Sequence, residues 1–114
     1  MPFLKVQTNS GMGAEVRNNL MKSLSKTVAD RLGKPERYVM VTIESGSPMM
    51  FAGNDEPLAY MELKSIGLPE ASTPSLSESL CTVIEKELGI PGDRIYIEFA
   101  DAKGHMWGWN KNTF

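Results

Sequence analysis

The feature that most constrains this fold is a junction that occurs twice, once in each half of the chain. Residues 32–37 (LGKPER) and 88–94 (LGIPGDR) share Leu-Gly-x-Pro followed by an arginine, and a β-branched run follows each. Glycine after the last apolar position favours a left-handed helix cap, and proline prevents the helix from continuing. Each half is therefore predicted to run from a helix into a strand at the same relative place.

The first half is predicted to be strand, helix and strand. Phe3–Thr8 has the length and composition of a short strand, and the segment 9–11 ends it. An apolar stripe with helical spacing follows at Val16, Leu20, Leu24, Val28 and Leu32. Arg37–Glu44 is rich in β-branched and aromatic residues and is predicted to be the second strand, and residues 45–57 a long loop.

The second half repeats this order. Leu58–Ser65 is predicted to be a strand, and Arg94–Ala100 the strand that closes the unit. Between them, Thr73 and Pro74 are predicted to be the N-cap and first residue of a helix, with an earlier start left open. The apolar face of that helix is Leu76, Leu80, Val83, Ile84 and Leu88.

We therefore predict one domain over residues 1–114, made of two tandem β-α-β units that divide near residues 56 and 57. Right-handed crossovers give each unit a parallel strand pair, and joining the units gives a four-stranded mixed sheet with both helices on one face. The fold class is α/β in its α+β form, with short strands in the C-terminal tail.

Two helices leave the other face of such a sheet uncovered. Tyr38 and Met40 in the second strand, and Tyr96 and Ala100 in the last, are predicted to bring apolar side chains to that face. Contact between this face and copies of the same chain would remove these apolar side chains from water. We therefore expect a closed homo-oligomer with sites at the subunit boundaries.

Composition excludes several classes of function. A formal charge of −2 gives no basic footprint for nucleic acid or for an anionic membrane. No apolar run approaches the ~20 residues that span a bilayer, and no signal-peptide pattern opens the sequence. The lone Cys81 cannot form an internal disulfide or a paired metal site, and we expect no metal and no cofactor. We expect a cytoplasmic protein, with unconventional secretion left open.

The first two residues, Met1 and Pro2, are a candidate catalytic feature. Removal of Met1 would turn the Pro2 nitrogen into a secondary amine, fixed by the strand that starts at once. An α-amino group titrates at about 7.7–8.0, and burial or a nearby cation lowers that value toward the range of a useful base. Many chains begin Met-Pro without such a role, so this hypothesis needs further support.

The C-terminal tail holds three large aromatic residues in a short space: Trp107, Trp109 and Phe114. One interpretation is a short ribbon that seals a subunit contact. The other is that these rings form the wall of a pocket for a flat apolar ligand.

Matching stretches occur in order along the whole chain. They are Pro2 with Thr8-Asn9, Gly33-Lys34-Pro35 with Tyr38, Met50–Gly53 through Glu56-Pro57, Leu63–Gly67, Asp93–Ile97, and Gly108–Asn110 through Thr113-Phe114. In these stretches the chain resembles the macrophage migration inhibitory factor family of the tautomerase superfamily, in a microbial form.

The resemblance implies a homotrimer with three active sites at subunit interfaces. It also implies cofactor-independent keto–enol tautomerisation of phenylpyruvate-like and dopachrome-like compounds. Carried across, Pro2 would be the catalytic base, and Lys34 with the backbone N–H of Ile66 would bind the substrate. The implied rim and wall residues are Ser65, Lys64, Glu98, Tyr96 from the neighbouring subunit, Phe3, Tyr38, Trp107, Trp109 and Phe114.

Some positions depart from the family pattern. Glu98 stands where an asparagine is common, Lys64 replaces a common histidine, and Trp107 replaces a smaller aliphatic residue. A carboxylate near Pro2 would raise the pKa of the amine, and Lys64 could offset it. Residues 58–61 lack the Cys-x-x-Cys of animal members, and residues 10–13 lack their receptor-surface arginine.

Three functions follow from these observations. The first is a tautomerase that uses Pro2. The second is a non-enzymatic signalling or binding protein, which the missing receptor-surface arginine disfavours. The third is a sister activity on the same scaffold, such as a hydratase or decarboxylase, which Glu98 and Trp107 keep open.

Overall fold

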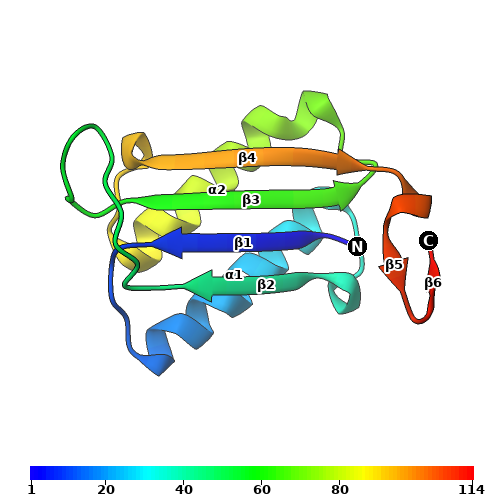
Figure 1. Ribbon diagram of the computed structural model, residues 1–114, viewed down its shortest axis with the longest axis horizontal. Coiled ribbons are helices and arrows are strands. Elements are labelled where there is room, and N and C mark those ends of the chain that lie inside the picture. Colours follow the sequence, from blue (N-terminus) through cyan, green and yellow to red (C-terminus); the bar gives the residue numbers. More distant parts are fainter.

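The chain folds as a four-stranded sheet with two helices on one face and a small two-stranded ribbon at one end (Figure 1). The computed structural model describes all of residues 1–114. The sheet contains β1 (Phe3–Thr8), β2 (Met40–Glu44), β3 (Ala59–Ile66) and β4 (Ile95–Ala102), in the order β2-β1-β3-β4. The helices are α1 (Ala14–Leu32) and α2 (Thr73–Leu88), and the ribbon is β5 (Gly108–Trp109) with β6 (Asn112–Thr113).

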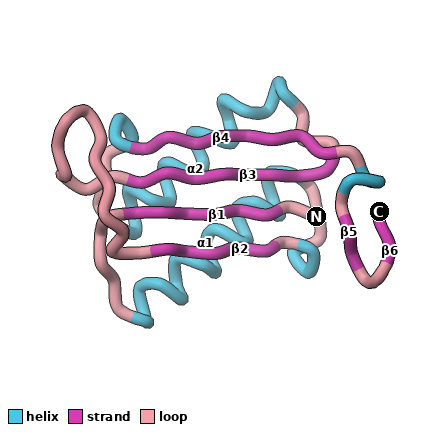
Figure 2. Tube along the Cα trace, viewed as in Figure 1, coloured by secondary structure: helices cyan, strands magenta, loops and turns pink.

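The strand pairing confirms the two tandem β-α-β units. β1 runs parallel to β2, β3 runs parallel to β4, and the two units join through the antiparallel pair β1–β3. The long loop between β2 and β3 lies at one end of the sheet, and the N-terminus and the ribbon lie at the other (Figure 2). The start of β1 is thus held between two neighbouring strands.

The core lies between the sheet and the helices. β1 and β3 alternate strictly, so that every second side chain is buried against α1 and α2. Leu20, Leu24 and Val28 of α1 and Leu80 of α2 are fully buried in this layer. Removal of each such side chain from water contributes about 1.5–3 kcal/mol, which makes this layer the main source of stability. No helix is long and apolar enough to cross a membrane.

Several predicted boundaries were wrong by a few residues. Residues 36–38 form a 3₁₀ turn, so β2 begins at Met40, and a second 3₁₀ turn at 92–94 delays β4 to Ile95. Prolines 35 and 91 precede these turns, and their extended backbone directs the chain into a tight turn before the strand. The N-cap of α2 is Ser72 rather than Thr73.

Val16 belongs to the predicted apolar stripe of α1 but is 41% exposed. The first turns of α1 extend past the edge of the sheet (Figure 1). No strand lies beneath them to bury the stripe.

The uncovered face of the sheet is more polar than we predicted. Met40 and Tyr96 are 66% and 65% exposed there, but Tyr38 lies in a 3₁₀ turn and not in a strand. The centre of the face carries ion pairs, with Lys64 Nζ 3.5 Å from a carboxylate oxygen of Glu62. The prediction of apolar side chains on this face is confirmed for Met40 and Tyr96, but charged residues occupy outward positions of β3 and its neighbours.

Carboxylates also lie side by side on the part of this face that β3 and β4 form. Glu62 and Glu98 are partners in register across β3 and β4. Burial, together with these two carboxylates, raises the pKa of Tyr60. The face is therefore a charged surface with aromatic residues at its margins.

Replacement of Gly33 by alanine should lower the free energy of unfolding by about 1–2 kcal/mol. Gly33 ends α1 with a φ of 63°, in the left-handed region, and a Cβ there would meet no atom within 4 Å. The cost is thus purely conformational. Urea unfolding measures it, with Gly11→Ala as the control, because Gly11 has equally open space and its φ lies outside the left-handed region. Equal stability of the two variants would contradict the prediction.

Candidate active site

A pocket of about 460 Å³ surrounds the start of the chain. We call it the N-terminal pocket. It lies at the end of the uncovered face, where Phe3 is flanked in register by Met40 and Lys64. Its lining residues are Met1, Pro2, Phe3, Arg37, Tyr38, Val39, Met40, Lys64, Trp107, Gly108, Trp109 and Phe114. Most of these side chains are apolar, and none is acidic.

Backbone hydrogen bonds fix the first two residues inside this pocket. The Met40 N–H donates to the Pro2 carbonyl oxygen at 3.0 Å, which extends the β1–β2 pairing to Pro2. The Met1 amino group donates to the Tyr38 carbonyl oxygen at 2.8 Å. Pro2 itself is buried. With Met1 attached, the Pro2 nitrogen is an amide and has no basic lone pair, so the α-amino group in the pocket is that of Met1.

The pocket favours a neutral amine. Burial first, and the charge of Lys34 second, lower the pKa of the Met1 amino group below its usual value of 8.0. Lys34 lies just beyond the lining residues, and its Nζ donates to the Ile66 carbonyl oxygen at 3.1 Å. A nitrogen base at this place would be deprotonated more readily than an amine in water.

Aromatic rings from the 3₁₀ turn at 36–38 and from the C-terminal tail form the pocket wall. Tyr38 packs edge-on against Trp109 and Phe114, with centroid distances of 5.7 and 6.0 Å. Trp109 and Phe114 stack on each other at 5.4 Å, and the Phe114 N–H donates to the Trp107 carbonyl oxygen at 3.1 Å. The C-terminal ribbon therefore belongs to the pocket wall, as the second interpretation of the tail requires.

Ser65 does not lie with the other predicted site residues. It alternates with Lys64 and Ile66 along β3, so its side chain is on the helix side, where it is fully buried. Its hydroxyl oxygen has no hydrogen-bond partner. The sequence could have predicted this orientation, because successive side chains of a strand point to opposite faces and the neighbour of a pocket-lining Lys64 must face the core.

Tyr96 and Glu98 are also absent from the N-terminal pocket of their own chain. Tyr96 is in register with Tyr60, which pairs with Gln7, four residues along β1 from Phe3. It packs on Phe51 at a centroid distance of 4.7 Å. Within one chain, these two residues lie toward the other end of the uncovered face.

Arg37 and Met40 are among the lining residues that were not predicted to belong to the site. Both belong to the predicted strand Arg37–Glu44, and nothing in the sequence pattern of that strand indicates a pocket. The 3₁₀ turn at 36–38 brings Arg37 onto the Tyr38 ring, with the guanidinium carbon 4.8 Å from the ring centroid.

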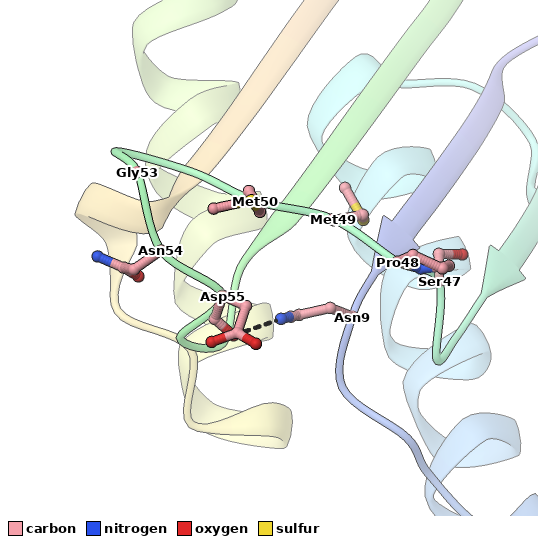
Figure 3. Close-up of a pocket in the computed structure, with 8 residues that line it drawn as sticks. All are labelled: Asn9, Ser47, Pro48, Met49, Met50, Gly53, Asn54 and Asp55. Carbon is pink, nitrogen blue, oxygen red and sulfur yellow. Dashed lines mark hydrogen bonds between the residues drawn. The ribbon is translucent and has the colours of Figure 1, made fainter.

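A larger hollow of about 980 Å³ lies at the opposite end of the sheet, in the loop between β2 and β3 (Figure 3). Asn9 closes its floor by donating to the Asp55 backbone oxygen at 2.8 Å. Arg94 holds the same loop through the carbonyl oxygens of Phe51, Glu56 and Pro57. The hollow is wide, has few apolar side chains and holds no amine, so we place the candidate chemistry in the N-terminal pocket.

Comparison with known proteins decides the family. The family model described as macrophage migration inhibitory factor (MIF) matches residues 1–114. The chain belongs to the MIF family. It is 37% identical to the MIF homolog of Brugia malayi and 38% identical to that of Trichuris trichiura, covering 100% of this chain and 99% and 100% of those proteins.

Solved structures of MIF-family proteins have the same fold. The crystal structure of the MIF homologue from Prochlorococcus marinus is 47% identical with a TM-score of 0.93, covering 98% of each chain. The MIF structure from Trichinella spiralis is 33% identical with a TM-score of 0.91, covering 98% of this chain and 99% of that one. The resemblance found in the sequence is thereby confirmed, and the chain has the fold of the tautomerase superfamily.

Proposed function

We propose that this MIF-family protein is a cofactor-independent keto–enol tautomerase of small aromatic keto acids, of the phenylpyruvate or dopachrome type. The observation that carries the proposal is that the Met1 amino group, next to Pro2, lies in an apolar, aromatic pocket and has its pKa lowered by burial and by Lys34. Proton transfer at carbon needs a base that is neutral near pH 7 and a positive charge where the enolate forms. The proposal requires removal of Met1, so that Pro2 carries the free amine.

The step conserves all atoms. The neutral Pro2 nitrogen takes a proton from the carbon beside the carbonyl, and the C–H electron pair becomes the C=C bond. The carbonyl oxygen becomes an enolate, stabilised by the Lys34 ammonium, which lies close enough to shift the amine. The protonated amine then returns the proton to the enolate oxygen and gives the enol. The reverse sequence converts the enol to the keto form.

The decisive assay uses protein shown by mass spectrometry to lack Met1. Ketonisation of the enol form of phenylpyruvate, followed by its ultraviolet absorbance, should be faster than the buffer rate. Absence of acceleration by such a processed and folded protein would refute the proposed activity. It would then favour a binding protein or a sister reaction on the same scaffold.

We also propose a homotrimer in which Tyr96 and Glu98 complete the pocket of a neighbouring copy. Two facts support it: both residues lie away from Pro2 in their own chain, and Tyr96 is 65% exposed in the single chain. Oppositely charged residues on the uncovered face would set the register of a contact between copies.

Sedimentation equilibrium should give three times the chain mass of 12.6 kDa. Tyr96→Ala and Pro2→Gly should each impair activity, and co-refolding the two variants should restore part of it. In a one-to-one mixture, about a quarter of the shared sites would have both residues intact. A monomeric mass, or no gain on co-refolding, would refute shared sites.

A further inference from the structure

The N-terminal pocket has more positive charge than a substrate with one carboxylate requires. Arg37 and Lys64 are both among its lining residues, Lys34 lies beside the amine, and no aspartate or glutamate of the same chain lines it. The whole chain, in contrast, carries a formal charge of −2. Positive charge is thus concentrated at this one concave site.

The three cations differ in what they contact. Lys64 is paired with Glu62 at 3.5 Å, and the Lys34 ammonium donates to the Ile66 carbonyl oxygen at 3.1 Å. Arg37 takes part in none of the ion pairs of the structure, and its guanidinium donates no side-chain hydrogen bond. Of the three, Arg37 alone has all its donors available to a ligand.

The position of Arg37 is nevertheless defined. Its guanidinium carbon lies 4.8 Å from the centroid of the Tyr38 ring, a cation–π distance. Tyr38 is held in turn by edge contacts with Trp109 and Phe114. A guanidinium stacked on a fixed ring keeps its planar N–H edge free for bidentate binding of a carboxylate or a similar oxyanion.

We propose that Arg37 binds a second anionic group on the ring of the substrate, so that this pocket prefers aryl keto acids with two acidic groups. The proposal rests on the proposed tautomerase function, in which Lys34 serves the keto-acid end. Arg37 would then be a specificity-determining residue: it binds the substrate without taking part in the proton transfer.

Kinetics with matched substrates test the preference. The native enzyme should show a kcat/KM for 4-carboxyphenylpyruvate above that for phenylpyruvate, and Arg37→Gln should lower this ratio about tenfold. The control Arg31→Gln removes the same charge from the exposed end of α1, on the helix side, and should leave the ratio unchanged. A ratio that Arg37→Gln leaves unchanged, or that Arg31→Gln lowers equally, would overturn the proposal.

Binding of unreactive analogues separates this proposal from the tautomerase proposal. By calorimetry, native protein should bind 4-carboxycinnamate more tightly than cinnamate, and Arg37→Gln should abolish the difference even if no catalysis is found. Equal binding of the two acids by native protein would refute the role of Arg37. Sedimentation of Arg37→Gln gives a further test, because a changed oligomeric state would mean that Arg37 pairs with another copy of the chain.

Discussion

Phenylpyruvate tautomerisation by Pro2→Gly should be slower than the native rate by about 10²-fold. The variant still has an N-terminal amine, but it loses the ring that fixes the backbone angle and that lies buried in the pocket. The glycine amine would therefore sample many positions, and a displacement of about 1 Å from the reacting carbon is enough for such a loss.

A second variant removes the basic nitrogen of Pro2 and leaves an amine only on the residue before it. Insertion of alanine between Met1 and Pro2 permits removal of the methionine but leaves the Pro2 nitrogen as an amide. Its activity should fall to the buffer rate. Mass spectrometry verifies the N-terminus of each sample, and circular dichroism verifies the fold. Native activity in the alanine-insertion variant would exclude Pro2 as the base.

Lys34→Met should lower kcat/KM for phenylpyruvate by about 10²–10³-fold, the usual cost of losing one group that stabilises an oxyanion. Methionine keeps a similar length and an apolar stem, so the decrease in kcat/KM measures the contribution of the ammonium group. Lys26→Met is the matched control, because Lys26 lies on α1 and pairs with Asp30 at its exposed surface. Equal losses in both variants would show that the effect is not specific to the pocket.

The pH profile of Lys34→Met gives an independent readout. The neutral amine is the active form, so kcat/KM should rise with pH and level off above the pKa of the amine. Burial and Lys34 lower the pKa of the Met1 amino group below its usual value of 8.0, and we expect the same two causes to lower the pKa of a Pro2 amine. Removal of the Lys34 charge should therefore move the midpoint to higher pH. An unchanged midpoint would mean that burial alone sets the pKa.

The repeated junction predicted the topology because it fixes chain direction. Leu-Gly-x-Pro ends a helix and returns the chain to the sheet, and two such returns admit few arrangements of four strands. Strand limits were harder to predict. At residues 36–38 the side chains suit a strand, but Pro35 leads into a 3₁₀ turn, and only the packed structure decides between them.

The candidate site was predicted in part, and the misses have physical causes. The aromatic residues of the tail and Tyr38 were identified by type and resemblance, and the structure brings them together at Pro2. Ser65 was misplaced because its position in β3 was read by resemblance and not by alternation. Arg37 was missed because its place in the pocket depends on a turn that its own sequence does not predict.

The placement of β1 has a consequence for how the protein matures. Pro2 is buried and paired to β2, and β1 is flanked on both sides by other strands, so the first residues cannot detach without disrupting the sheet. A peptidase must draw the Met1–Pro2 bond into its own cleft, which the finished fold does not allow. We therefore expect any excision of methionine to occur during synthesis, before the sheet forms, and a chain that folds with Met1 attached to retain it.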